Sequence, residues 1–222
     1  MLPQTVSSLL LSLSLFSEAA SAQQIGTGIP EVHPRLRTQK CTKDEGCKTQ
    51  QTYLVADARH RDFHNDKGET IECSAANTTL CPDEATCAKN CILEGVEYGS
   101  LGVLASDTAV TLRNYLFDGK EHKGVSPRVY LLAEDQEKYE QIKLLNQEIS
   151  FQVDASNIGC GMNGALYLSE MDLSGGRGKL NPAGAKYGTG YCDAQCPRSD
   201  FINGVVSESL QYSSQLLQNR LF

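Results

Sequence analysis

Three groups of residues have the types and spacing that a chemical site needs. The first is His60-x-Asp62-x-His64, since alternate residues of a strand share one face and could present imidazole and carboxylate groups to a metal ion. So short a cluster rarely completes a four-ligand site. The pattern therefore favours a solvated polar strand end, and we predict no metal site.

The second group is the carboxylate pair in Glu170-Met171-Asp172. Side chains at i and i+2 of a strand point to the same side, and retaining glycosidases hold two catalytic carboxyl groups about 5–5.5 Å apart. The same residues also fit a strand that ends in the turn sequence Ser174-Gly175-Gly176. We favour the turn.

The third group combines amide, carboxylate and phenol side chains, which can bind sugar hydroxyls and stack on a pyranose ring. Its members are Asn163, Tyr167, Tyr191, Asp193 and Gln195. The sequence contains no Gly-x-Ser-x-Gly motif, phosphate loop or dinucleotide fingerprint, and we predict no cofactor.

Strand patterns dominate the elements that must position these groups. Alternating or β-branched runs predict strands at 52–55, 109–116, 128–132, 148–154 and 164–171, and short helices are expected at 83–90 and 136–145. Strands joined by long, cysteine-rich loops predict a mostly β fold, an antiparallel β-sandwich or jelly roll.

Composition limits the classes of partner. The 222 residues carry a formal net charge of −7, which argues against binding nucleic acid or an anionic membrane surface. Residues 1–22 have the short apolar run and small-residue cleavage site of a signal peptide, so we expect a secreted, extracellular protein. Asn77-Thr78-Thr79 is an N-glycosylation sequon, which indicates an exposed loop at Asn77.

Nine cysteines in a secreted chain predict disulfides, and the odd number leaves at least one thiol unpaired within the chain. They divide into a crowded group and three that stand apart. The crowded group is Cys41, Cys47, Cys73, Cys81, Cys87 and Cys91; the others are Cys160, Cys192 and Cys196.

Several ordered motifs resemble glycoside hydrolase family 7, the secreted cellobiohydrolases and endo-β-1,4-glucanases. The longest is GAKYGTGYCDAQCPR at 184–198. The others are EVHP at 31–34, LCPD at 80–83, TCAKNC at 86–91, RVYL at 128–131, CGMNGALY at 160–167 and FING at 201–204. The resemblance runs from about residue 23 to residue 204.

The resemblance implies a concanavalin A-like antiparallel β-sandwich with disulfide-stapled loops, and hydrolysis of β-1,4-glucosidic bonds with retention. The partner would be a β-glucan (cellulose) chain, bound by a monomer. Asn163, Tyr167, Asp193 and Gln195 would line the glucan subsites, with Arg128 a more distant contact. The implied disulfides are Cys41–Cys47, Cys73–Cys91 and Cys81–Cys87, leaving Cys160, Cys192 and Cys196 as orphan thiols.

The family's catalytic strand reads Glu-x-Asp-x-x-Glu, and this pattern is missing here. Glu170-Met171-Asp172 imitates its start, but position 175 is Gly and the strand carries no catalytic residue in the family. We therefore expect an incomplete sandwich at 23–204, a non-matching tail at 205–222, no catalytic residue and no activity from this chain alone. The alternatives are a non-catalytic glucan-binding protein and a disulfide-stapled protein with an unrelated partner.

The chain also lacks tryptophan. In the family, the strand that matches residues 57–62 carries tryptophans, one of them a sugar-stacking platform, and here His60 and Asp62 stand in those places. Losing a stacking ring costs on the order of 1–3 kcal/mol. Processive action on crystalline cellulose is therefore not expected.

Overall fold

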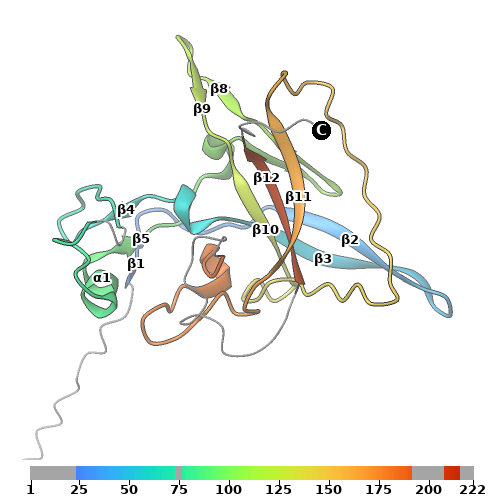
Figure 1. Cartoon of the computed structure of the whole chain (residues 1–222), viewed down its shortest axis with the longest axis horizontal. Coiled ribbons are helices and arrows are strands. Elements are labelled where there is room, and N and C mark those ends of the chain that lie inside the picture. Colours follow the sequence, from blue (N-terminus) through green and yellow to red (C-terminus); the bar gives the residue numbers. More distant parts are fainter. Residues whose placement is uncertain (1–23, 74–76, 192–207, 216–222) are drawn as a thin grey trace, which may run out of the picture.

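A five-stranded antiparallel sheet forms the centre of the molecule (Figure 1), with the strand order β11-β12-β10-β3-β2. The computed structural model describes residues 24–73, 77–191 and 208–215, the last range as backbone only. The strands are β2 (Arg35–Thr42), β3 (Gly46–Ala56), β10 (Arg128–Leu132), β11 (Asn163–Glu170) and β12 (Glu208–Gln215). This sheet confirms the predicted mostly β fold class.

Smaller elements surround the sheet. A three-stranded sheet joins β1 (Gln24–Ile25), β5 (Ile92–Leu93) and β4 (Phe63–His64). Two hairpins pair β6 (Val103–Ser106) with β7 (Ala109–Leu112) and β8 (Tyr115–Phe117) with β9 (His122–Gly124). The helices are α1 (Glu84–Asn90) and the 3-10 turns η1 (Ala58–His60), η2 (Tyr98–Leu101) and η3 (Gly184–Tyr187).

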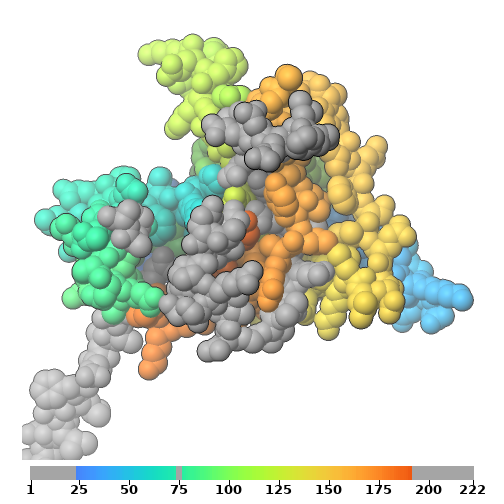
Figure 2. Space-filling model, in the orientation of Figure 1, coloured from blue at the N-terminus to red at the C-terminus, as the bar shows by residue number. Residues whose placement is uncertain are grey.

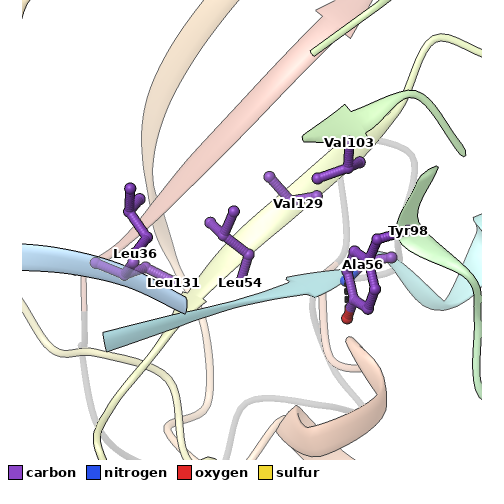
Figure 3. Packing of buried hydrophobic residues seen from close by; sticks show 7 residues of the cluster. All are labelled: Leu36, Leu54, Ala56, Tyr98, Val103, Val129 and Leu131. Atoms are coloured by element: carbon purple, nitrogen blue, oxygen red, sulfur yellow. Dashed lines mark hydrogen bonds between the residues drawn. The ribbon is translucent and has the colours of Figure 1, made fainter. Parts of the chain in front are cut away.

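Both faces of the sheet are covered at its centre. On the first face, Leu54 and Ala56 of β3 and Val129 and Leu131 of β10 pack with Tyr98, whose hydroxyl accepts the Ala56 N–H at 3.2 Å (Figure 3). The intervening residues point the other way, as strand geometry requires. On this second face, the buried cluster is Val55, Tyr130, Leu132, Tyr139, Met171 and Ala185.

The predicted strand at 109–116 is wrong in its extent. Residues 109–112 pair with the preceding strand β6, whereas residues 115–117 pair with the following strand β9. The chain changes partner at Asn114, whose backbone carbonyl accepts the N–H of Val125 at 2.8 Å. One alternating pattern therefore covers two hairpins.

Two other predicted elements are also wrong. None of the pairings among the described strands includes 148–154, where Phe151 is 52% and Val153 66% exposed. Alternation alone supplies no partner strand, so this segment is coil. Residues 136–145 form a turn and an isolated bridge between Tyr139 and Leu132 in place of a helix. In this conformation the Tyr139 ring is buried against the second face of the sheet.

The described residues contain three disulfides, Cys41–Cys47 between β2 and β3, and Cys73–Cys91 and Cys81–Cys87 around α1, the same pairs that the family resemblance implies. Cys160 is exposed, with a free thiol. Cys192 and Cys196 lie outside the described residues. Within the described ranges, no helix is long and apolar enough to cross a membrane.

Candidate functional site

The register of the sheet gathers polar and aromatic side chains on the second face. Tyr130 and Tyr167 both pair with Gln211 of the intervening strand β12, so their side chains lie on the same side of the sheet. Arg128 lies two residues before Tyr130, and Asn163 four residues before Tyr167, on the same side. The register thus places three predicted binding residues, Arg128, Asn163 and Tyr167, on one face.

Arg128 belongs to a buried cluster at the start of β10. Its Nη1 lies 3.6 Å from Oδ2 of Asp57, and its guanidinium carbon lies 4.7 Å from the ring centroid of Tyr191. Tyr130 donates its hydroxyl hydrogen to the same Asp57 oxygen, and its ring lies 6.0 Å from that of Tyr191. The Arg128 Nε is buried and has no hydrogen-bond partner.

Asp57 can orient Arg128 and Tyr130 because its own carboxylate is held in place at the start of η1. Its Oδ1 accepts the N–H of Arg59 at 2.7 Å, which caps the turn. Burial and the Asp57 carboxylate raise the pKa of Tyr130, so the phenol stays neutral and donates. Burial also lowers the pKa of His60, although the charge of Asp57 opposes this shift.

Asn163 and Tyr167 form the more exposed part of the site. The Asn163 side-chain amide lies 3.4 Å from the Tyr167 hydroxyl, and Tyr167 is 45% exposed. These two side chains present an amide, a hydroxyl and an aromatic ring to solvent. Such groups bind neutral polyols by hydrogen bonds and ring stacking.

A second buried charge cluster lies beside the loop that leads to Tyr191. Glu31 is 2% exposed at its side chain, accepts from Arg61 Nη2 at 2.9 Å and from the Tyr98 hydroxyl at 2.6 Å, and lies 3.2 Å from Nε2 of His33. The Arg61 guanidinium carbon also lies 5.2 Å from the centroid of the Tyr187 ring. This cluster ties residues 31–33 and 61 to the loop of η3.

The structure separates the other candidates from this face. Asp172 Oδ1 accepts hydrogen bonds from Ser174 N at 2.8 Å and Gly176 N at 3.1 Å, and these contacts, with the Ser174 hydroxyl as the strongest cause, lower its pKa. Asp172 thus caps the turn after β11. Glu170, the last residue of that strand, is exposed. This geometry is consistent with the prediction that residues 170–172 end a strand and lead into a turn.

His60, Asp62 and His64 do not lie along one strand, because η1 ends at His60 and β4 begins only at Phe63. The two ring nitrogens of His64 contact Glu94 Oε1 at 2.7 Å and the Asn65 carbonyl at 2.8 Å. The expectation of a shared polar strand face is therefore wrong. Helical geometry at residues 58–60 removes the alternation on which it depended.

Sequence reasoning missed Asp57 and Tyr130 as parts of the site. Tyr130 had a usable signal, since it lies at i+2 from Arg128 on a predicted strand. Asp57 is 73 residues from Tyr130 in the chain, and only the tertiary fold brings them together. Asp193 and Gln195, the remaining predicted binding residues, lie outside the described residues.

Comparison with known proteins gives one consistent result. The family model described as glycosyl hydrolase family 7 matches residues 25–219. The endo-beta-1,4-glucanase celB of Aspergillus oryzae is 54% identical over 188 residues, which is 83% of this chain and 45% of that protein. Endoglucanase EG-1 of Hypocrea jecorina is 46% identical over 213 residues, 95% of this chain and 46% of that protein.

Solved structures agree with these sequences. The native structure of Humicola insolens endocellulase EGI has a TM-score of 0.71 at 44% identity, covering 78% of this chain and 44% of that one. A family 7 cellobiohydrolase from Daphnia pulex has a TM-score of 0.67 at 38% identity, covering 78% and 41%. The chain therefore spans a little under half the length of the relatives that it matches.

Proposed function

The chain belongs to glycosyl hydrolase family 7, and on that premise we propose that it supplies the glucan-binding face of an endo-acting, retaining β-1,4-glucanase. The observation that best supports the proposal is the shared sheet face of Arg128, Asn163 and Tyr167. The endo-type assignment follows the names of the Aspergillus and Hypocrea relatives. Asp193 and Gln195, which the family motif names, remain proposed glucan-binding residues.

The chemistry of the face suits a neutral sugar. Asp57 is a carboxylate on this face, and its negative charge is already compensated by Arg128 and by the Tyr130 hydroxyl. The amide of Asn163 and the phenol of Tyr167, which are the exposed groups described on this face, are both uncharged. A cellulose chain offers hydroxyls at its edges and apolar ring faces, which match these groups.

We further propose that the 222-residue polypeptide does not hydrolyse glucan by itself. The printed sequence contains no Glu-x-Asp-x-x-Glu pattern, and Asp172 is held in a turn. Retaining hydrolysis needs a nucleophile and a separate acid–base group on opposite sides of the scissile bond. A chain that has the binding residues but lacks the two catalytic groups also suits a second candidate function, that of a non-catalytic glucan-binding protein.

Secretion belongs to the same proposal. Residues 1–22 act as a signal peptide, Asn77 carries an N-linked glycan, and the extracellular product is a monomer whose ligand is cellulose. The three disulfides support an oxidising compartment. Mass spectrometry of the protein recovered from culture medium tests both modifications. A product that begins at Met1 would contradict the secretion proposal.

Calorimetric titration with cellopentaose tests the binding proposal. Tyr167→Ala removes the exposed ring and should weaken binding about tenfold, since one stacked ring contributes about 1.4 kcal/mol. Leu168→Ala is the matched control, because Leu168 is on the same strand but points to the other face. Equal affinities for wild type and Tyr167→Ala would refute this site. Release of reducing ends by the purified chain would refute its inactivity.

A further inference from the structure

We propose that the β8–β9 hairpin is a second sugar-contact site, in which Tyr115 and Phe117 form a platform for a neutral β-linked glucan chain that extends past the sheet face. This inference rests on the proposed function of that face. The hairpin spans residues 115–124 and stands out from the body of the molecule in the ribbon and space-filling views (Figures 1 and 2).

The two rings are exposed in a regular arrangement. Tyr115 is 49% and Phe117 62% exposed, and strand alternation places both on the same side of β8. Phe117 pairs with His122, whose ring centroid lies 5.2 Å from its own. Tyr115 pairs with Gly124, and its ring passes 3.7 Å from the place where a Cβ of Gly124 would be.

This pairing leaves one side of each ring free. The glycine opposite Tyr115 lets the phenol ring lie across the neighbouring strand, and the His122 ring packs against the Phe117 ring at an interplanar angle of 45°. Aromatic side chains from both strands are thus exposed along the hairpin. Flat apolar surfaces of this kind stack on the C–H face of a pyranose ring, which is a weakly polar surface of matching size.

The charge of the hairpin favours a neutral ligand. Between Tyr115 and Gly124 the chain carries two acidic residues, Asp118 and Glu121, and two basic residues, Lys120 and Lys123. Asp118 is also engaged in the turn, where its Oδ1 accepts the N–H groups of Lys120 at 2.9 Å and Glu121 at 3.0 Å. A balanced surface gives no electrostatic reason to bind nucleic acid or an anionic membrane.

The hairpin is continuous with the proposed binding face. Three residues separate its end at Gly124 from Arg128, the first residue of β10. At its base, the Asn114 side-chain nitrogen lies 3.9 Å from the sulfur of Met162, the residue before Asn163. Phe117 lies three residues from Asn114, about 10 Å along the strand. These two connections bring the hairpin base next to the Asn163 end of the face, from which the proposed glucan extends towards the rings.

The test compares ligands of two lengths by calorimetry on the 222-residue chain. Phe117→Ala and Tyr115→Ala should each weaken cellohexaose binding about three- to tenfold, while cellobiose binding at the sheet face stays unchanged. Phe117→Trp should bind cellohexaose at least as tightly as wild type, whereas Phe117→Leu, which is apolar but not flat, should behave like the alanine variant. Phe151→Ala is the matched control, since Phe151 is 52% exposed and lies outside the hairpin.

The outcomes separate this inference from the proposed function. If the hairpin variants bind cellohexaose as wild type does while Tyr167→Ala weakens binding, the platform is refuted and the sheet face stands. If the wild-type chain binds neither sugar, the proposed function fails and the platform with it. If the hairpin variants change only the sedimentation coefficient, the rings are a contact between copies of this chain, which also refutes the platform.

Discussion

Asp57 connects η1 and β10 through one carboxylate. It begins η1, accepts from Tyr130 on β10 and lies beside Arg128, although it is itself only 3% exposed. Its negative charge compensates a buried guanidinium that otherwise has an aromatic ring, Tyr191, as its main neighbour. The arrangement of the second face therefore depends on this residue more than on any exposed binding group.

Asp57→Asn should lower the free energy of unfolding by about 3 kcal/mol, because it leaves the Arg128 charge buried and uncompensated. Tyr130→Phe is the matched control. It keeps the charge pair and loses one hydrogen bond to a charged group, so it should cost about 1.5 kcal/mol. Urea unfolding measures both values. Equal losses for the two variants would show that the charge pair contributes nothing beyond the hydrogen bond.

Glu31 should make stability depend on pH. Burial alone would raise the pKa of this carboxyl, but hydrogen bonds from Arg61, His33 and Tyr98 and the Arg61 charge lower it to about 2. Because the folded pKa lies below the ordinary value of 4.5, the stabilisation is fully present above pH 4.5 and is lost as pH falls towards 2. The loss should reach about 3 kcal/mol.

The measurement is urea unfolding of wild type and Glu31→Gln between pH 6 and pH 2.5. Other carboxylates titrate in both proteins and cancel in the difference. The advantage of wild type should be constant above pH 4.5 and should shrink steadily below it. An advantage that does not change across this range would mean that Glu31 is not held ionised by its neighbours.

The family motif names the exposed residues of the proposed site, whereas it does not show the contacts of the buried ones. Asn163 and Tyr167 are in a recognisable motif, and their local strand fixes their spacing. Asp57 and Glu31 depend on contacts 73 and 67 residues away in the chain, with Tyr130 and Tyr98. Such partners follow from the tertiary fold, which no local pattern contains.

At the scale of elements, the loop of η3 is fixed against β3 by a glycine. Gly188 has φ +72°, and its carbonyl accepts the N–H of Ala58 at 3.1 Å. A Cβ at this position would overlap the carbonyl oxygen of Ala56. The close approach places Tyr191, three residues later, beside Arg128.

Gly188→Ala should therefore cost at least about 2 kcal/mol, from the left-handed backbone conformation and the overlap together. It should also weaken cellopentaose binding, because Tyr191 and Arg128 would move. Gly99→Ala is the control, since a Cβ there meets no atom within 4 Å and the backbone is not left-handed. Thermal unfolding and calorimetry check both effects. A fully stable Gly188→Ala variant would contradict the proposed close packing.

Elements were predictable where burial covers both faces of a strand or where a capping residue begins a helix. The run at 128–132 became β10, which is buried along its whole length, and the helix at 83–90 became α1 with Asp83 as its cap. The alternating run at 148–154 is coil, because periodicity describes one strand and carries no information about a neighbour.

At the scale of the whole molecule, the chain matches less than half of the length of its relatives. It covers 45% of the Aspergillus oryzae relative and 44% of the Humicola insolens structure, yet its five-stranded sheet has both faces packed at the centre. Ordered motifs in the sequence predicted the family and the fold class. The proposed function requires one face of this sheet to bind β-1,4-glucan.

The most direct test is an NMR titration of the ¹⁵N-labelled 222-residue chain with cellopentaose. If the sheet face binds the sugar, the largest amide shifts should lie on β10, on β11 and in the loop that ends at Tyr191. The Tyr167→Ala substitution should reduce these shifts at the same sugar concentration. Shifts confined to other elements, such as α1 and β5, or no shifts at all, would contradict the claim.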